Sequence, residues 1–394
     1  MRYTYIISAL LLLLPAAVPA AAQDRTPDSA GTDLTDIRRR IFGARSPRTD
    51  SGAAQFALVP GVSYGPASGV SVSLTAVKTY RPRNAGPDDK LSNIIGSASV
   101  AQKGQLVFQA NAVVFTPGDR HNVLAEWRYM RYPSPTWGLG ARSANEAEYQ
   151  LDFDYLKLHQ SFLWRLRKNL YVGPGLFVDA LWRVRELAPP AHGTDYQRYG
   201  LAARERAIGP ALRLLYDSRI NTVNPASGTY ASFALRTVRT ELGSTSNWQS
   251  LQVDLRRYIP MGRRQNVLAF WSYNWLTLGG GQTPYLLLPS TGWDDQYNTG
   301  RGYQQGRYRG RNLLYLEGEY RFGITRNGLL GAVAFANAQA FPSNPLRGLG
   351  RILPGAGGGL RIKLNKYSAT NLAFDYGFGV DGSRFLALNV GEVF

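Results

Sequence analysis

The chain has 394 residues, no cysteine and a formal net charge of +18, and aromatic residues make up 12% of it. Without cysteine it has neither a disulfide framework nor a lipid-modified N-terminal cysteine. The three histidines lack metal-ligand spacing, and no apolar run after the first residues approaches the ~20 residues of a membrane-spanning helix. These features disfavour a disulfide scaffold, a lipoprotein, a metal enzyme and a helical membrane protein.

The first 22 residues have the layout of a secretory signal peptide. Arg2 gives a basic start, residues 6–18 form an apolar core, and small residues precede Gln23. An N-terminal membrane anchor is the alternative, but the core is short and Pro15 interrupts it. We therefore expect residues 1–22 to be removed after Ala22 and the protein to be exported.

Residues 23–55 form a polar leader that is too short for a separate domain. Its segment DLTDIRRRIFG, residues 33–43, has the composition of one or two amphipathic helical turns. Such a turn would lie at the periplasmic membrane face or in the mouth of the domain that follows. We favour the simpler interpretation, a short periplasmic leader that is mostly disordered.

From residue 56 to residue 394, apolar and polar residues alternate. The segments 312–323, 369–380 and 383–394 show this pattern most clearly. Alternation is typical of a strand with one apolar and one polar face. We predict sixteen strands, near residues 56–65, 69–80, 91–102, 105–116, 120–133, 147–164, 168–186, 204–217, 228–239, 247–260, 264–279, 312–323, 328–341, 351–364, 369–380 and 383–394.

An even number of strands, each long enough to cross a bilayer when tilted, predicts an all-β fold. We expect a 16-stranded antiparallel transmembrane barrel in the outer membrane, with the apolar face toward lipid. Phe394 would be the C-terminal signal that such barrels present for assembly. The connections support this prediction if short turns share one side and long loops the other. The short ones are residues 64–69, 102–105, 167–169, 325–328 and 380–383, and the long ones are 134–146, 187–203 and 280–311.

The longest connection contains GRGYQQGRYRGRN, residues 300–312, with four arginines and no acidic residue. Such a run could bind nucleic acid, bind an anionic surface or fix a loop inside the protein. Nucleic acid is disfavoured because an exported barrel loop rarely meets it. Lipopolysaccharide phosphates suit the arginines that point outward, and Arg307, Arg309 and Arg311 should tolerate alanine better than Arg301 if they mainly face solvent or lipopolysaccharide.

Residues 300–322 resemble the BamA/TamA-like outer-membrane superfamily, also called the bacterial surface antigen family. Its R-G-F/Y motif matches Arg301, Gly302 and Tyr303, although Gly300 stands where an aliphatic residue is usual. The resemblance extends over residues 56–394. Further matching stretches are Gly310-Arg311-Asn312, Glu319-Tyr320-Arg321-Phe322, the D-x-R…P-x-x-G pattern of residues 217–228, and the closing strands from residue 355.

In that family the motif loop folds back into the lumen, where acidic residues on the two following strands grip its arginine. The resemblance thus implies a long external loop that folds inward and pins Arg301 against Glu319 and Glu317. Arginine suits this role because a carboxylate accepts two hydrogen bonds from its planar fork. Where the family has a second acidic partner, this chain has Asn337, which keeps an acceptor but loses the charge.

Family members that assemble barrels or export polypeptides carry tandem periplasmic repeats, and residues 23–55 are too few to hold one. We therefore expect the short branch of the family, acting in outer-membrane biogenesis by inserting protein or lipid without client-capturing domains of its own. The alternative is a passive structural or narrow transport barrel. Asn389, Gly391 and Glu392 make the last strand weakly apolar, which fits either a loose seam with the first strand or a wet periplasmic edge.

We expect no enzymatic activity and no cofactor. His121, His159 and His192 are scattered, and Asp294-Asp295 are interpreted as solvated loop acids. The expected partners are outer-membrane lipids, lipopolysaccharide and the barrel assembly machinery during the protein's own insertion, with no nucleic acid.

Overall fold

The computed structural model describes residues 31–33, 36, 55–65, 68–84, 86, 89–191, 193–200, 202–219, 221–262, 266–295, 297–366 and 369–394. The expected signal peptide, most of the expected leader and His192 lie outside these residues. In the described part of the chain, no helix is long and apolar enough to cross a membrane, a result that concerns helices alone.

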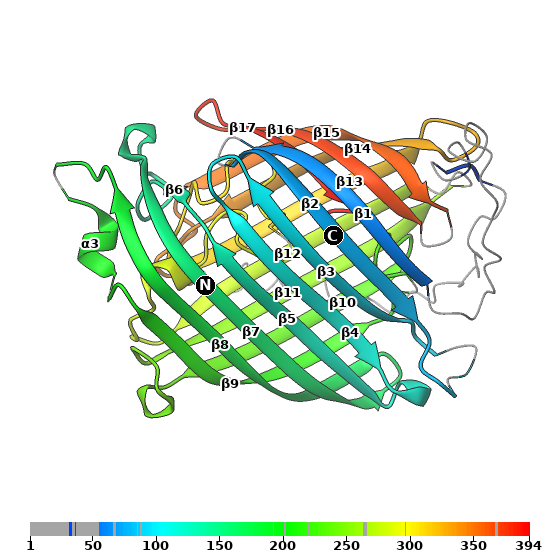
Figure 1. Cartoon of the computed structure of the whole chain (residues 1–394), viewed down its shortest axis with the longest axis horizontal. Helices are drawn as coiled ribbons and strands as arrows, with labels where there is room; N and C mark the ends of the chain where they lie inside the picture. Colours follow the sequence, from blue (N-terminus) through cyan, green and yellow to red (C-terminus); the bar gives the residue numbers. More distant parts are fainter. Residues whose placement is uncertain are drawn as a thin grey trace.

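The described residues form an antiparallel β-barrel with very little helix (Figure 1). Sixteen strands make the wall, each paired with the next along the chain, while the three-residue β6 pairs with the start of β7. The strands are β1 (Gln55–Gly65), β2 (Gly69–Tyr80), β3 (Ser92–Ala101), β4 (Leu106–Phe115), β5 (His121–Arg131), β6 (Ser134–Thr136), β7 (Tyr149–Arg167), β8 (Leu170–Leu187), β9 (Glu205–Asp217), β10 (Gly228–Val238), β11 (Trp248–Met261), β12 (Asn266–Leu278), β13 (Asn312–Gly323), β14 (Leu330–Ala340), β15 (Ile352–Asn365), β16 (Thr370–Gly379) and β17 (Arg384–Val390). The short helices are η1 (Pro117–Asp119), η2 (Asn145–Ala147), α3 (Asp195–Tyr199), η3 (Thr240–Leu242) and η4 (Tyr285–Leu287).

The two-residue alternation of the sequence becomes an outward apolar face and an inward face of mixed character. On β13, Leu316 points outward and is 51% exposed, whereas its neighbour Glu317 points inward and is 1% exposed. On β16, Phe378 is 53% exposed and Asp375 is 1% exposed. The predicted barrel with an apolar outer face and a sixteen-strand wall is therefore confirmed.

Two details of the prediction are wrong. The last strand ends at Val390 instead of Phe394, because Gly391 takes a left-handed conformation (φ 104°) that turns the chain out of the sheet. The short turns also do not share one side. Successive turns alternate between rims, so residues 102–105 and 380–383 lie on the rim that carries the long loops, which we call the loop rim.

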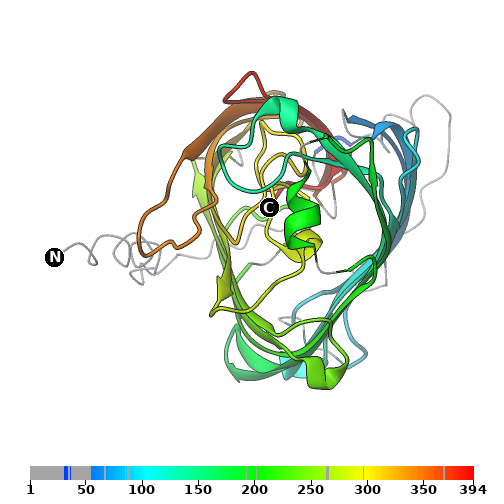
Figure 2. The same cartoon turned by 90° about the vertical axis from the view of Figure 1, so that its left-hand side faces the viewer.

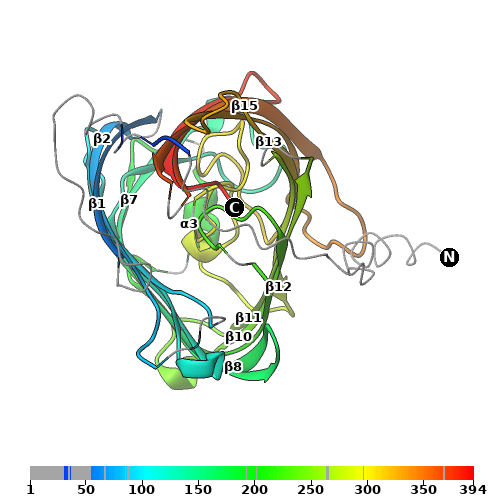
Figure 3. The same cartoon turned by 90° about the vertical axis from the view of Figure 1, so that its right-hand side faces the viewer.

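The 279–311 connection does not extend outside the barrel. Seen from either end, this segment lies inside the barrel, and the final residues of the chain also turn into the interior (Figures 2 and 3). Tyr303 and Tyr308 of the loop pack with Phe394 and with inward aromatic residues such as Trp271 in one buried cluster. The lumen therefore has an aromatic core in addition to polar groups.

The barrel wall has a seam between its first and last strands. β1 and β17 lie side by side, yet no backbone ladder joins them among the described residues (Figure 1). Each is paired on its other side, to β2 and β16 respectively. The wall is also lowest here, since β17 has 7 residues whereas β7 has 19.

The few described residues of the leader contact the rim opposite the long loops. The amide nitrogen of Thr32 donates to the carbonyl oxygen of Asn327 (2.9 Å), in the β13–β14 turn. Lys366, at the end of β15, donates to Asp33 and forms an ion pair with Asp36 (2.9 Å). At these positions the leader contacts the barrel, and the expectation that the leader is mostly disordered stays a prediction, since nearly all of it lies outside the described residues.

Candidate functional site

The R-G-Y motif lies deep in the lumen because glycines bring the loop backbone against the wall. Gly302 has a φ of 115°, which residues with side chains rarely adopt. A Cβ at Gly302 would lie 2.5 Å from the carbonyl oxygen of Phe378, and one at Gly377 would lie 2.9 Å from the Gly302 nitrogen. The loop and β16 are therefore in backbone contact at this point.

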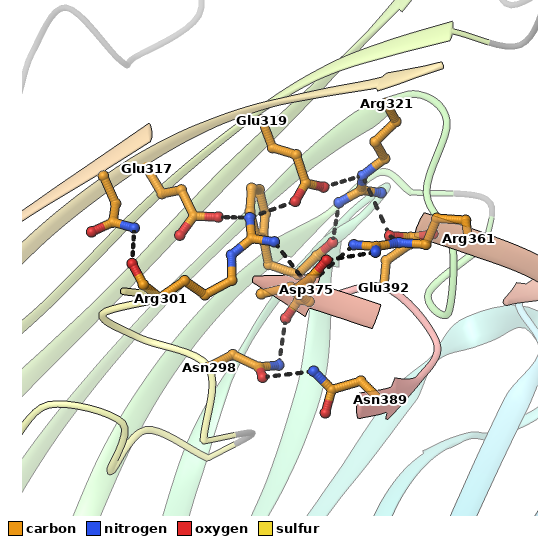
Figure 4. Close-up of polar contacts among 12 residues, drawn as sticks. Asn298, Arg301, Glu317, Glu319, Arg321, Arg361, Asp375, Asn389 and Glu392 are labelled. Carbon is orange, nitrogen blue, oxygen red and sulfur yellow. Dashed lines mark hydrogen bonds and ion pairs between the residues drawn. The ribbon is translucent and has the colours of Figure 1, made fainter. Parts of the chain in front are cut away.

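Three carboxylates surround the guanidinium of Arg301, which is 1% exposed (Figure 4). Its Nη2 donates to Glu317 and to Glu319 on β13, and its Nη1 donates to Asp375 Oδ2 on β16 at 3.1 Å. The ring of Phe335 lies against the guanidinium, with the ring centroid 3.7 Å from Cζ. The loop arginine thus ties two strands that are separated in the wall by β14 and β15.

Two further arginines extend this cluster toward the last residues of the chain. Arg321 donates to Glu319 Oε1 (2.6 Å) and to the carbonyl oxygen of Phe394 (2.8 Å). Arg361 on β15 donates to Asp375 Oδ1 (2.6 Å) and to Glu392 Oε2 (2.8 Å). We call these seven side chains the lumenal ion cluster: Arg301, Arg321, Arg361, Glu317, Glu319, Asp375 and Glu392.

The charges in the lumenal ion cluster nearly balance. Three guanidinium groups face four carboxylates, and every side chain is almost fully buried. Buried charges need such pairing because the cost of removing them from water is large. Burial alone would lower the pKa of Arg301, but Glu317, Glu319 and Asp375 together raise it, so this guanidinium stays charged.

The structure brings most of the expected motif residues together. Arg301 contacts both Glu317 and Glu319, while the Tyr303 hydroxyl donates to the carbonyl of Pro354 and accepts from the Val380 nitrogen (3.1 Å). Asn337 takes another role than expected. Its Nδ2 donates to the backbone carbonyl oxygen of Arg301 (2.7 Å), so it holds the main chain of the loop and not the guanidinium.

Sequence reasoning missed two acidic contacts of the loop. Asp375 on β16 accepts from Arg301, although the sequence comparison indicated only Glu317, Glu319 and Asn337 as partners of this arginine. Asp295 was interpreted as solvated, yet its carboxylate binds Lys157 Nζ on β7 (2.5 Å) and its carbonyl accepts from Arg128 on β5 (2.7 Å). No local pattern distinguishes a loop acid that reaches the opposite wall from one in water.

Two of the remaining loop arginines do not face solvent or lipopolysaccharide, so the condition for their tolerance of alanine is not met. Arg307 is 5% exposed and donates to Ser143 and Asn145 of the β5–β7 loop. Arg309 is 2% exposed and donates to the backbone carbonyls of Tyr285 and Leu288. They are buried because Arg307 satisfies acceptors of the β5–β7 loop and Arg309 satisfies backbone carbonyls of its own loop, which an arginine fork does readily. Of the three, Arg311 alone is partly exposed.

The last residues also lie elsewhere than expected. Phe394 is not the end of an extended strand, since β17 ends at Val390 and the Phe394 ring stacks on Trp271 in the lumen, with centroids 5.2 Å apart. Its role as an assembly signal stays a prediction. Glu392, expected at a loose seam or in water, is 2% exposed and paired with Arg361. Asn298 of the loop holds this tail by donating to the Val393 carbonyl (2.9 Å).

A loop of this kind narrows the lumen, because sixteen-stranded porins otherwise enclose an aqueous channel. We expect the intact protein to give small, irregular currents in planar bilayers. Deletion of residues 300–311 should raise them by removing the motif from the lumen. Deletion of residues 344–348, in the exposed β14–β15 loop, is the control and should leave the current unchanged. Large steady currents from the intact chain would contradict an inward loop.

Comparisons with known proteins agree with this fold. No family model and no curated protein matches the chain. A Haemophilus ducreyi BamA lacking POTRA domains 1–3 superposes with a TM-score of 0.52 at 16% identity, covering 86% of this chain and 70% of that one. CdiB from Acinetobacter baumannii gives 0.54 at 12% identity, and CdiB from Escherichia coli gives 0.54 at 13%. The Acinetobacter baumannii match covers 86% of this chain and 59% of that protein, and the Escherichia coli match covers 87% of this chain and 66% of that protein. The chain thus has a barrel fold of the BamA and CdiB type.

Proposed function

We propose that this protein acts in outer-membrane biogenesis, helping proteins or lipids to enter the outer membrane beside the seam between β1 and β17. The observation that carries the proposal is that no backbone ladder joins β1 and β17 in the part of the chain that the structure describes. Two adjacent edges leave N–H and C=O groups without strand partners, and such groups are costly in hydrocarbon. An incoming strand that pairs with either edge would satisfy them.

The height of the wall supports the same proposal. At about 3.4 Å per residue, the seven residues of β17 span roughly 24 Å along the strand, and less along the membrane normal once tilted. The hydrocarbon core is ~30 Å thick, so the bilayer must become thinner or disordered beside β17. A thin, disordered bilayer lowers the barrier to insertion of another chain or of a lipid.

A passive structural barrel is the second candidate, and the tethering of the tail favours it. Glu392 and Phe394 are held from inside by Arg361 and Arg321, which restrains the end of β17. A barrel whose seam never opens would leave the surrounding bilayer perturbed but would admit no client.

Under either candidate the protein is not an enzyme, and its surroundings are outer-membrane lipids and lipopolysaccharide. The barrel assembly machinery would act on it during its own insertion. The likeness to BamA and CdiB supports this setting through the fold alone.

A lock across the seam separates the two candidates. The chain has no cysteine, so one cysteine in β1 and one in β17 can be joined without side reactions. In cells depleted of the native protein, the oxidised pair should fail to restore the outer-membrane proteome and lipid asymmetry, and reduction should restore both. The control pair is Ala112→Cys with Ala125→Cys, which stand opposite each other on β4 and β5.

Every variant must first be recovered from the outer-membrane fraction with a mobility on unboiled gels that differs from the boiled form. Full complementation by the oxidised seam lock would contradict the insertion role and favour the passive barrel. Failure of the control pair as well would show that cross-linking of any wall strands is harmful, and would remove the support for the seam.

A further inference from the structure

A second polar region of the lumen, away from the lumenal ion cluster, contains a small cavity. Its volume is about 40 Å³, and it lies between β5, β7, β8, β10, β11 and β12 and the loop residues around η4. A water molecule needs roughly 10–15 Å³ by this measure, so the space suits about three waters or one small ion. It is too small for a sugar or an acyl chain.

Donor groups without acceptors line this cavity. Arg128, Arg236 and Trp248 are each no more than 5% exposed, and their Nε or Nε1 atoms have no hydrogen-bond partner in the described chain. The indole nitrogen of Trp293, on the loop side, is also without one. Guanidinium and indole N–H groups can only donate, so they require an acceptor.

The carboxylate that lines the cavity has little capacity left. Asp179 Oδ1 accepts from the Tyr155 hydroxyl (2.5 Å). Its Oδ2 is within hydrogen-bond distance of His159 Nε2 (3.0 Å) and accepts from Arg236 Nη1 (2.5 Å). Water in the cavity would satisfy the donors but would bring hydrogens of its own that need acceptors. The cavity therefore suits a species that accepts hydrogen bonds and donates few or none.

The charges around the cavity point the same way. Four cations lie in or beside its wall, and three carboxylates pair with them. Even without a proton on His159, one positive charge remains uncompensated. The cations are Arg128, Lys157, Arg213 and Arg236, and the carboxylates are Glu126, Asp179 and Asp295.

We propose that this cavity is a binding site for one small inorganic anion, of the size of chloride or of a single tetrahedral oxyanion. The anion accepts from Arg128 and Arg236 on the wall and from the indole N–H of Trp248, and it neutralises the remaining charge. It joins strands β5, β10 and β11 to the loop segment that carries η4 and Trp293. Bound anion therefore stabilises the inward position of the loop, independently of the R-G-Y motif.

The test uses the purified full-length barrel in detergent, in sodium gluconate, whose anion is too large for the cavity. Chloride or phosphate replaces gluconate at constant ionic strength, so that general charge screening does not change. The readout is the thermal midpoint followed by tryptophan fluorescence. A ligand that binds only the folded state raises this midpoint in a saturable manner.

The thermal midpoint of wild type should rise in a saturable manner with chloride, phosphate or both. The anion that acts at the lower concentration is the preferred one. Trp248→Phe removes one donor but keeps a ring, and should weaken apparent affinity about tenfold. Arg128→Lys keeps the charge, loses Nε and should weaken it similarly. Trp182→Phe, in an outer stack with Tyr129, is the matched control and should bind as wild type does.

Bromide soaked into crystals of the wild-type protein provides a readout that needs no variant. An anomalous peak between Arg128, Arg236 and Trp248 supports the proposal. It is overturned by the absence of any saturable anion effect, by an equal effect in Trp248→Phe and wild type, or by bromide peaks at other places only.

Discussion

Arg301→Ala is expected to release the 279–311 loop from the wall, at a cost of about 3–5 kcal/mol in the free energy of loop docking. The variant leaves Glu317, Glu319 and Asp375 buried without their shared cation. Arg321 and Arg361 still neutralise part of the charge on Glu319 and Asp375. Glu317 has no other ion pair among the described residues, so most of the penalty arises there.

The loss should appear as exposure of the loop and not as collapse of the barrel, because the strand ladders of the wall do not depend on Arg301. Trypsin added to intact cells should cut at Arg307, Arg309 or Arg311 in the variant and leave these three sites uncut in wild type. Arg301→Lys should give an intermediate result, since lysine keeps the charge but not the planar fork. Arg347→Ala changes an exposed arginine of the β14–β15 loop and serves as the control. A loop that stays protected in Arg301→Ala would show that other contacts dock it.

Gly302→Val should prevent the motif from seating, with an expected cost of roughly 2–6 kcal/mol from backbone strain and overpacking together. The φ of 115° is unfavourable for valine, and the new Cβ would lie 2.5 Å from the Phe378 carbonyl oxygen. Neither conflict is relieved by a side-chain rotation, because the neighbour is backbone. Arg301 would then be displaced from its carboxylates although its own side chain is unchanged.

The measurement for Gly302→Val is the same trypsin assay, combined with the single-channel current. Both accessibility and current should rise, as they should when residues 300–311 are deleted. Gly280→Ala is the matched control in the same loop, because a Cβ there meets no atom within 4 Å and the position needs no left-handed backbone. Equal protection of Gly302→Val and Gly280→Ala would indicate that the close approach to β16 does not fix the loop.

The sequence predicts the wall of this protein well because alternation is a local property. Glu317, Glu319 and Arg321 fall on the inward face of β13 as expected, since every second residue of a strand shares a side. The contacts across the lumen are of another kind. Asp375 is 74 residues from Arg301, and only the path of the loop decides which inward acids it meets.

The same limit explains the end of the chain. The pattern of residues 383–390 is that of a strand. The one local sign that the next residues leave the sheet is Glu392, which is polar where a lipid-facing residue would be apolar. Its partner Arg361 lies on β15, two strands away from β17 in the wall, so the pairing is visible only in three dimensions.

The sharing of carboxylates in the lumenal ion cluster has a thermodynamic consequence. Asp375 is bound by Arg301 from the loop and by Arg361, which also holds Glu392 beyond β17. Glu319 is shared in the same way between Arg301 and Arg321, the residue that holds Phe394. Withdrawal of the loop removes Arg301 from Glu319 and Asp375, which changes how strongly these carboxylates bind Arg321 and Arg361. Withdrawal of the last residues of the chain changes in turn how strongly the same carboxylates bind Arg301. By linkage the two free-energy changes are equal. Loop docking and the position of the last strand are therefore coupled equilibria, so a change that shifts one of them also shifts the other.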